Sequence, residues 1–204
     1  MFDQVYAKIE ELEEQTQLIL FDTVIPEAQD YVAGKRRPFF IKNLDNDIQE
    51  NFQDKGIYIF YDVASMRALY VGTAGADGMK GENTLVNRIR GLLKFNINDE
   101  TKSSTHHALA AKLLAEKQLL VHDRPIQNQL AWHDFLKKYW GLKIMALESA
   151  SFIKLMESSI FSIYKTPLNN ENILDKSESD LDENLVKFED YRIKKWEVVE
   201  NDES

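Results

Sequence analysis

Two short segments rich in β-branched and aromatic residues constrain this chain more than any other feature. Residues 56–61 have the composition of a buried strand and end at Asp62. Residues 69–72 form a second segment of this kind, and the six residues 63–68 separate the two. A connection of that length suits a hairpin. The sequence therefore predicts two neighbouring antiparallel strands within the fold.

Helical patterns lie on both sides of this strand pair. Apolar side chains recur at helical spacing in four stretches, and a third strand is expected at residues 142–147. The expected helices cover residues 1–20, 84–93, 105–118 and 151–164. Thr84, at the start of the second helix, has the residue type of a helix N-cap. Pro167 follows the last helix and marks its end.

Charge divides the chain into three parts. The net charge is −9 overall, which by itself disfavours a nucleic-acid partner. Residues 55–170, however, hold 15 Lys and Arg against 10 Asp and Glu, whereas residues 1–54 and 171–204 each have a net charge of −7. The centre of the chain is therefore basic, and the whole-chain charge is a poor guide to what the centre binds.

The sequence also bears on where the protein works. It contains no cysteine, so it has neither disulfides nor thiolate zinc sites. The N-terminus lacks the basic and apolar regions of a secretory signal, and no apolar run reaches the roughly 18–20 residues of a membrane span. We therefore expect a cytoplasmic protein with no membrane partner.

The two predicted strands carry a pair of tripeptides. Gly-Ile-Tyr stands at residues 56–58, and Tyr-Val-Gly follows at residues 70–72 after eleven intervening residues. This arrangement resembles the paired motif of the GIY-YIG nuclease superfamily, with Val in the middle of the second tripeptide.

Three more residues fit the pattern of that superfamily. Arg88 lies on the first helix after the second motif, and Glu157 lies on a later helix. Asn169 follows Glu157 by twelve residues, with Pro167 two residues before it. This spacing is similar to the excision-repair nuclease branch, and the resemblance covers residues 55–170.

The resemblance implies a fold and a domain organisation. The fold would be α/β (α+β in packing), with a small three-stranded antiparallel sheet flanked by helices. A nuclease domain would occupy residues 55–170, preceded by an N-terminal helical extension at residues 1–54. Residues 171–204 would form an acidic tail with a short amphipathic element.

The implied activity is that of a hydrolase, a metal-dependent endonuclease that cuts DNA phosphodiester bonds. Glu157 offers the hard oxygen ligand that Mg²⁺, or Mn²⁺ in its place, prefers. Arg88 presents a permanently charged fork that matches two phosphate oxygens. The superfamily gives water activation to a motif tyrosine, and Tyr58 and Tyr70 both remain possible here. A tyrosine is a poor base unless its surroundings lower its pKa.

Two further positions have supporting roles in this interpretation. Gly72 allows the backbone to approach closely where a Cβ would obstruct the site, and Asn169 offers a donor and an acceptor that position a neighbour. The chain also departs from the superfamily. Leu92 stands one turn after the arginine in place of a His or Tyr, and Thr73 follows the second motif in place of a Lys. Both changes remove groups that help to activate water.

The nucleic-acid interface is expected near Arg88, with Arg90, Lys94 and Lys80 as contacts to the phosphate backbone. A histidine pair, residues 106–107, could substitute for the missing proton-transfer group, but an exposed pair at a helix start is the preferred interpretation. The alternative function is a non-cleaving nucleic-acid-binding or regulatory module on the same scaffold. Cleavage of RNA or branched DNA also stays open, as does a homodimer formed through the N-terminal helix.

Overall fold

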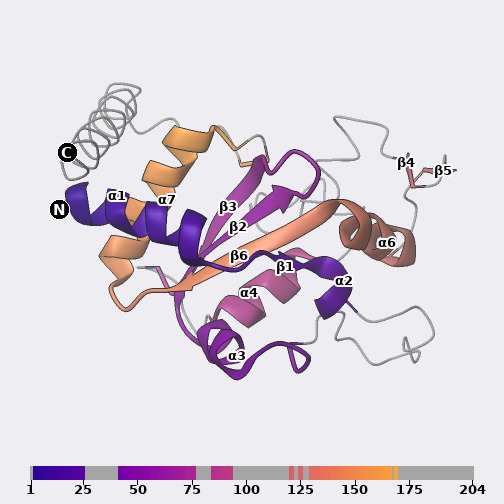
Figure 1. Ribbon diagram of the computed structural model, residues 1–204, viewed down its shortest axis with the longest axis horizontal. Coiled ribbons are helices and arrows are strands. Elements are labelled where there is room, and N and C mark those ends of the chain that lie inside the picture. The colour runs from indigo at the N-terminus through magenta and orange to yellow at the C-terminus, as the bar shows by residue number, and fades with distance from the viewer. Residues whose placement is uncertain are drawn as a thin grey trace, which may run out of the picture.

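An antiparallel β-sheet organises the molecule (Figure 1). In the computed structural model, the description covers residues 2–25, 41–76, 84–93, 120–121, 124–125, 129–166 and 168–169. The sheet has four strands in the order β1-β6-β2-β3, and each neighbouring pair is antiparallel. The strands are β1 (Ile19–Leu20), β2 (Gly56–Asp62), β3 (Ala68–Ala74) and β6 (Trp140–Ala146).

The predicted hairpin is confirmed as β2 and β3. In its register Tyr58 lies opposite Gly72, and Phe60 lies opposite Tyr70. The two tripeptide motifs therefore pair side by side. An irregularity between Phe60 and Tyr61 shifts the register near the turn.

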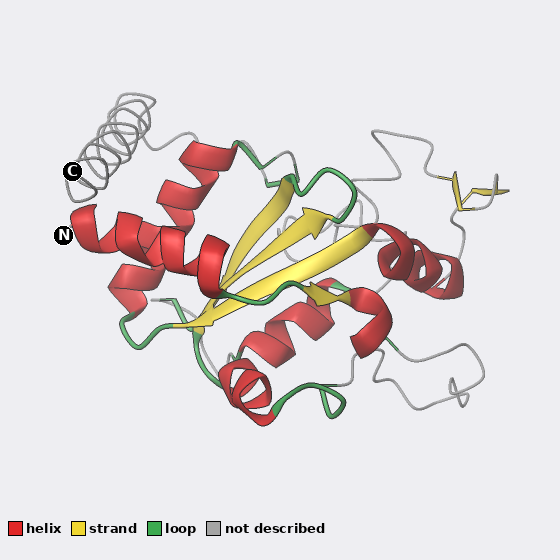
Figure 2. Ribbon diagram, viewed as in Figure 1, coloured by secondary structure: helices red, strands yellow, loops and turns green. Residues whose placement is uncertain are grey.

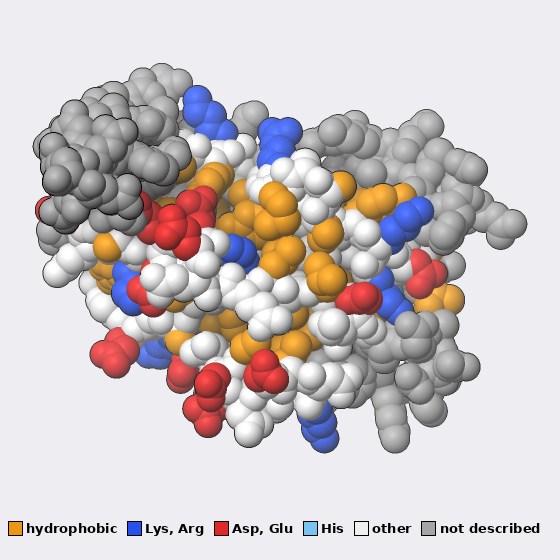
Figure 3. Space-filling view, in the orientation of Figure 1, with side chains coloured by type: hydrophobic (Ala, Val, Ile, Leu, Met, Phe, Trp, Pro, Cys, Tyr) orange, Lys and Arg blue, Asp and Glu red, His pale blue; other side chains and the backbone are white. Residues whose placement is uncertain are grey.

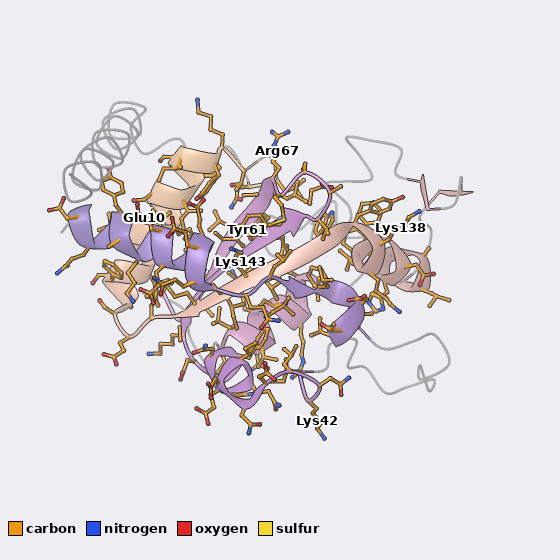
Figure 4. All side chains as sticks on the ribbon, viewed as in Figure 1. Glu10, Lys42, Tyr61, Arg67, Lys138 and Lys143 are labelled. Atoms are coloured by element: carbon orange, nitrogen blue, oxygen red, sulfur yellow. The ribbon has the colours of Figure 1, made fainter. Side chains whose placement is uncertain are left out.

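The expected sheet of three strands is wrong by one strand, because β1 adds a fourth at the edge of β6. We expected a helix over residues 1–20, but α1 covers Phe2–Glu10 and continues as a π-helical turn, η1, over Glu11–Gln15. The ammonium group of Lys143 on β6 donates to the carbonyl groups of Leu12 and Glu13. This contact ties η1 to the sheet, and the chain then extends into β1 (Figure 4).

The remaining elements are mostly helices. They are α2 (Phe21–Val24), α3 (Asn46–Gln53), α4 (Leu85–Leu92), α6 (Gln129–Tyr139) and α7 (Ala150–Tyr164), with a two-stranded ribbon of β4 (Leu120–Val121) and β5 (Arg124–Pro125). The predictions for α4 and α7 are confirmed, whereas α6 and the ribbon were not predicted. The helix expected at residues 105–118 and the tail at residues 171–204 lie outside the described residues.

Two hydrophobic cores lie on the two faces of the sheet (Figure 2). Alternate residues of β2 supply them: Ile57 and Ile59 pack toward α1 and α7, whereas Tyr58 and Phe60 pack with α2, α3, α4 and α6. The fold is therefore α+β, as expected. The described part of residues 1–54 contributes to both cores, so it packs directly on the sheet. None of the helices described is both long and apolar enough to cross a membrane.

The ends of α4 and α7 follow their sequence signals in part. Thr84 occupies the N-cap of α4, but its side chain makes no capping hydrogen bond. Ser149 caps α7 by accepting from the Phe152 amide. At the other end of α7, Lys165 adopts a left-handed conformation with φ of 45°, which turns the chain back toward β3 just before Pro167.

Candidate active site

Four predicted site residues from four different elements come together beside β3. Tyr58 belongs to β2, Tyr70 to β3, Arg88 to α4 and Glu157 to α7. The positive charge of Arg88 opposes the rise in the pKa of Glu157. The charges of both residues also act on the pKa of both tyrosines. Because α4 and α7 pack against opposite faces of the sheet, these side chains meet around its β3 edge.

The two motif tyrosines lie on the same face of the hairpin. Their ring centroids are 6.1 Å apart, with an angle of 32° between the ring planes. Tyr58 is fully buried, whereas Tyr70 retains 9% of its surface. Tyr70 is therefore the more accessible of the two tyrosines.

Gly72 makes room for the Tyr58 ring. A Cβ at this position would lie 2.3 Å from the Tyr58 hydroxyl oxygen and 2.4 Å from its Cζ atom. No side chain fits at that separation, and the glycine is required by the cross-strand neighbour. The close approach predicted for Gly72 is thus present, and its partner within the protein is Tyr58.

Burial raises the pKa of both tyrosines, and it raises that of Tyr58 well above its ordinary value. The hydroxyl groups also interact with each other, and this interaction raises the pKa of Tyr58 while lowering that of Tyr70. The geometry is not that of a regular hydrogen bond, since the Tyr58 hydroxyl makes none to a described residue.

Arg88 lies on the sheet-facing side of α4 and is half-buried. Its positive charge lowers the pKa of Tyr70, of Tyr58 and of Glu157. Leu92, one turn later, is buried in the hydrophobic core and supplies no proton-transfer group. Arg90 is two residues further along the helix than Arg88, so the two side chains do not share a face.

The other basic residues expected at the interface fall elsewhere. Lys80 and Lys94 lie outside the described residues, as does the histidine pair at 106–107. Of the predicted phosphate contacts, the structure therefore describes only Arg90.

Glu157 carries the most perturbed carboxyl group of the described residues. It lies in the middle of α7 and is half-buried. Burial raises its pKa to about 7, against opposing effects from Arg88, Lys154 and a hydrogen bond with Thr73. A carboxyl group poised at this value near a partly open site is typical of functional centres.

Thr73 has a different role from the one its sequence position suggested. Its side chain is 4% exposed and hydrogen-bonds with the Glu157 carboxyl group. At the position where the expected pattern has a lysine, this chain therefore has a threonine that orients the Glu157 carboxylate. Sequence analysis missed this role and that of Lys154. The spacing of three residues on one helix is the signal that identifies Lys154 as a neighbour of Glu157.

Asn169 does not join the four converging side chains; it holds the backbone of β3. Its Nδ2 donates to the carbonyl of Val71 at 2.7 Å, and its Oδ1 accepts from the Val71 amide at 2.9 Å. The Thr166 hydroxyl also donates to Oδ1, at 2.6 Å. Asn169 thus holds the strand that carries Tyr70, and its role as a positioning group in catalysis stays a prediction.

A metal at this site would rely on one carboxylate. Among the described residues, no three His, Cys, Asp or Glu side chains cluster in a way that could hold an ion. Glu157 alone is compatible with Mg²⁺, which commonly binds proteins through one or two carboxylates and keeps several of its waters. The carboxylate would have to lose its proton first.

No protein-family model, curated protein or solved structure matches this chain.

Proposed function

We propose that this protein is a metal-dependent endonuclease that hydrolyses DNA phosphodiester bonds, with a fold of the GIY-YIG type. The observation that carries the proposal is the convergence of Tyr58, Tyr70, Arg88 and Glu157. These residues are separated by up to 99 positions along the chain, yet the charges of Arg88 and Glu157 act on the pKa of both tyrosines, and Arg88 acts on the pKa of Glu157. A structural role would explain any one of them, but it does not explain an arginine, a carboxyl group and two tyrosines gathered at one edge.

Arg88 is suited to hold the phosphate. Its guanidinium stays charged at any working pH and offers two parallel donors to phosphate oxygens. It is half-buried beside the acidic group of Glu157, where the lower dielectric strengthens its interaction with added negative charge. The site therefore favours an anionic substrate.

Tyr70 is the tyrosine to which we assign the attacking water. It is the more exposed of the pair, and although burial raises its pKa, Arg88 and the Tyr58 hydroxyl both oppose that rise. Tyr58 is enclosed, and its interaction with the Tyr70 hydroxyl favours the phenolate form of Tyr70. In this assignment Tyr70 first loses its own proton to solvent, its phenolate then accepts a proton from the attacking water, and Tyr58 holds Tyr70 in place.

Glu157 is the residue that would hold Mg²⁺ or Mn²⁺, and Thr73 would orient its carboxylate. Such an ion, when bound, supplies positive charge that stabilises the leaving oxygen. Because the Glu157 pKa is about 7, proton and metal compete for the carboxylate near neutral pH. Metal affinity should therefore rise as the pH increases from 6 to 8.

Nicking of supercoiled plasmid tests the proposal directly. Wild type is incubated with plasmid and Mg²⁺ or Mn²⁺ and compared with Glu157→Gln and Tyr70→Phe. Glu148→Gln, which changes an exposed carboxylate just before α7, is the matched control. We expect wild type and the control to nick and the two site variants to lose at least about 100-fold in rate. Intact plasmid with wild type, or equal nicking by all four proteins, would contradict the proposal.

A non-cleaving nucleic-acid-binding module is the second candidate. Two observations favour it: the position of the expected proton-transfer group is the buried Leu92, and both tyrosine pKa values are raised. Gel-shift assays with DNA duplex, branched DNA and RNA, run beside the nicking assay, separate the two functions. Binding without nicking would support the module, and the preferred substrate would emerge from the same comparison.

A further inference from the structure

Along much of its length, the outer edge of β6 pairs with no other strand that the structure describes. The Val63 amide donates to the Tyr139 carbonyl, and the Leu147 amide donates to the Lys55 carbonyl. These bonds extend the β2–β6 ladder at both ends, and hydrogen-bonding residues alternate along an antiparallel pair. The odd-numbered residues of β6 therefore turn their backbone groups toward β2, and the even-numbered residues turn theirs outward.

Only part of this outer edge has a partner. Leu142 faces Ile19 of β1, but the pairing with β1 stops at that residue. Ile144 and Ala146 turn their N–H and C=O groups in the same outward direction, and no hydrogen bond joins those groups to another described residue. Two residues of β6 thus offer donors and acceptors at strand spacing.

A cavity of about 410 Å³ lies against this free edge. Consecutive residues Ile144, Met145 and Ala146 line it, although their side chains alternate between the two faces of the sheet. The cavity therefore meets β6 along its edge. We call it the β6-edge groove; one wall is formed by the end of η1 and the start of β1, and the other by α3.

The walls of the β6-edge groove are acidic. Its lining includes Glu11 on one side and Asp45 and Asp47 on the other, and none of the described lining residues is Lys, Arg or His. Glu11 is paired with Lys8, whereas Asp45 and Asp47 are exposed. Figure 3 shows acidic side chains over the α3 region of this face, with apolar side chains visible above them. The groove therefore combines a backbone edge, an apolar floor and negative walls.

We propose that the β6-edge groove binds an extended basic peptide of a partner protein by strand addition. Ile144 and Ala146 would pair with the peptide backbone, as exposed sheet edges do in this mode of recognition. Lysine or arginine side chains at alternate positions of the peptide would reach Asp45 and Asp47. Two pairing residues span about 7 Å of extended backbone, so a peptide of about five residues is enough.

This surface is separate from the candidate active site. The groove lies beyond β6, on the side where β1 begins, whereas Tyr70 lies on β3 at the opposite edge of the sheet. Variants in the groove should therefore leave nuclease activity unchanged. A failure of one proposal does not imply a failure of the other.

Peptide binding to the full-length protein tests the inference. The probe is a fluorescein-labelled peptide, Lys-Val-Lys-Val-Lys with blocked ends, measured by fluorescence anisotropy at low salt. We expect binding that weakens about 3- to 10-fold in the double variant Asp45→Asn/Asp47→Asn, since exposed ion pairs contribute modestly. Asp54→Asn, which removes an exposed carboxylate just past α3 and outside the groove, is the matched control and should bind like wild type.

Backbone pairing needs its own measurement. A peptide of the same sequence, N-methylated at the residues that pair, keeps its charge but loses its donors, and its affinity should fall at least 10-fold. Hydrogen exchange of the Ile144 and Ala146 amides should slow when the unmodified peptide is bound. Equal affinity for both peptides, or unchanged exchange at these amides, would overturn strand addition.

The sequence Lys-Arg-Arg at residues 35–37 of this same chain is the competing occupant. If Lys35→Ser/Arg36→Ser/Arg37→Ser binds the probe at least 10-fold more tightly than wild type, that segment occupies the groove and the proposal of a partner peptide is wrong. Equal affinity supports the partner.

Discussion

The Tyr58 ring fills the space that a side chain at position 72 would need. This contact links the tripeptide at residues 56–58 to the tripeptide at residues 70–72. The Tyr58 ring lies over Gly72 because the two residues are cross-strand neighbours. The ring is completely buried, so it has little freedom to move away from an added side chain. The orientation of Tyr58, and through it the support for Tyr70, rests on the absence of a Cβ.

The first prediction concerns this contact. Gly72→Ala should lower the free energy of unfolding by about 1–3 kcal/mol, the usual cost of forcing extra atoms into a packed core. Gly91→Ala is the control. Gly91 lies on helix α4, and a Cβ at this position would meet nothing within 4 Å. It should be neutral or stabilise by up to about 1 kcal/mol. Urea unfolding measures both, and equal effects would contradict the interpretation.

Glu157 connects the site to pH. Its pKa is about 7 in the folded protein, against an ordinary value of 4.5. Between these values the folded state binds more protons than the unfolded state, so stability falls as the pH rises from about 4.5 to about 7. Above pH 7 the loss is complete, because the carboxyl group is then ionised in both states.

The second prediction follows from that sign. In metal-free buffer the free energy of unfolding of Glu157→Gln should equal that of wild type near pH 4.5 and exceed it by about 1–3 kcal/mol at pH 8. This range is smaller than the full pKa shift would give, because the group is partly exposed. The neutral glutamine still accepts a hydrogen bond from Thr73. Urea unfolding across the pH range provides the measurement. Parallel profiles for the two proteins would show that Glu157 is not perturbed.

At the scale of elements, Asn169 links the end of α7 to the edge strand β3. Its side chain pairs with both backbone groups of Val71, and the Leu168 amide donates to the Leu69 carbonyl at 3.0 Å. The chain after α7 thus covers part of an edge that would otherwise be unpaired. Because Tyr70 lies between Leu69 and Val71, this link holds the tyrosine's backbone in place.

The third prediction tests the link. Asn169→Ala should cost about 2–4 kcal/mol, because it removes hydrogen bonds and leaves buried backbone groups unsatisfied. The amide of Val71 should then exchange at least 10-fold faster with solvent. Thr166→Ala removes only the hydroxyl donor to Asn169 and should cost about 1 kcal/mol. An unchanged Val71 amide would show that the strand does not need this clamp.

Elements with strong local patterns were predictable from the sequence, and the others were not. The β2–β3 hairpin and α7 follow from composition and helical spacing over seven or more residues. β1 has two residues and forms only because β6 lies beside it. α6 was not predicted, although Trp132, Phe135 and Leu136 have helical spacing. The strand pattern that follows them is the stronger local signal.

At the scale of the whole molecule, the candidate site depends on distances that no local pattern encodes. The motif spacing indicated Tyr58, Tyr70, Arg88 and Glu157 as site residues. These four side chains come close to one another only because α4 and α7 pack on opposite faces of the sheet. Thr73 illustrates the limit. Its chemistry suggested a lost function, and only the fold places its hydroxyl against Glu157.

The last prediction concerns how one such molecule cuts a duplex. If the protein is the nuclease proposed above, each chain holds one set of these four residues, and a monomer acting alone would break one strand at each encounter. With supercoiled plasmid, nicked circles should therefore accumulate before linear product, and the nicking rate should rise in proportion to protein concentration. Gel electrophoresis over time measures both. Linear product formed at once, with a rate rising as the square of concentration, would instead indicate two chains acting together, each cutting one strand.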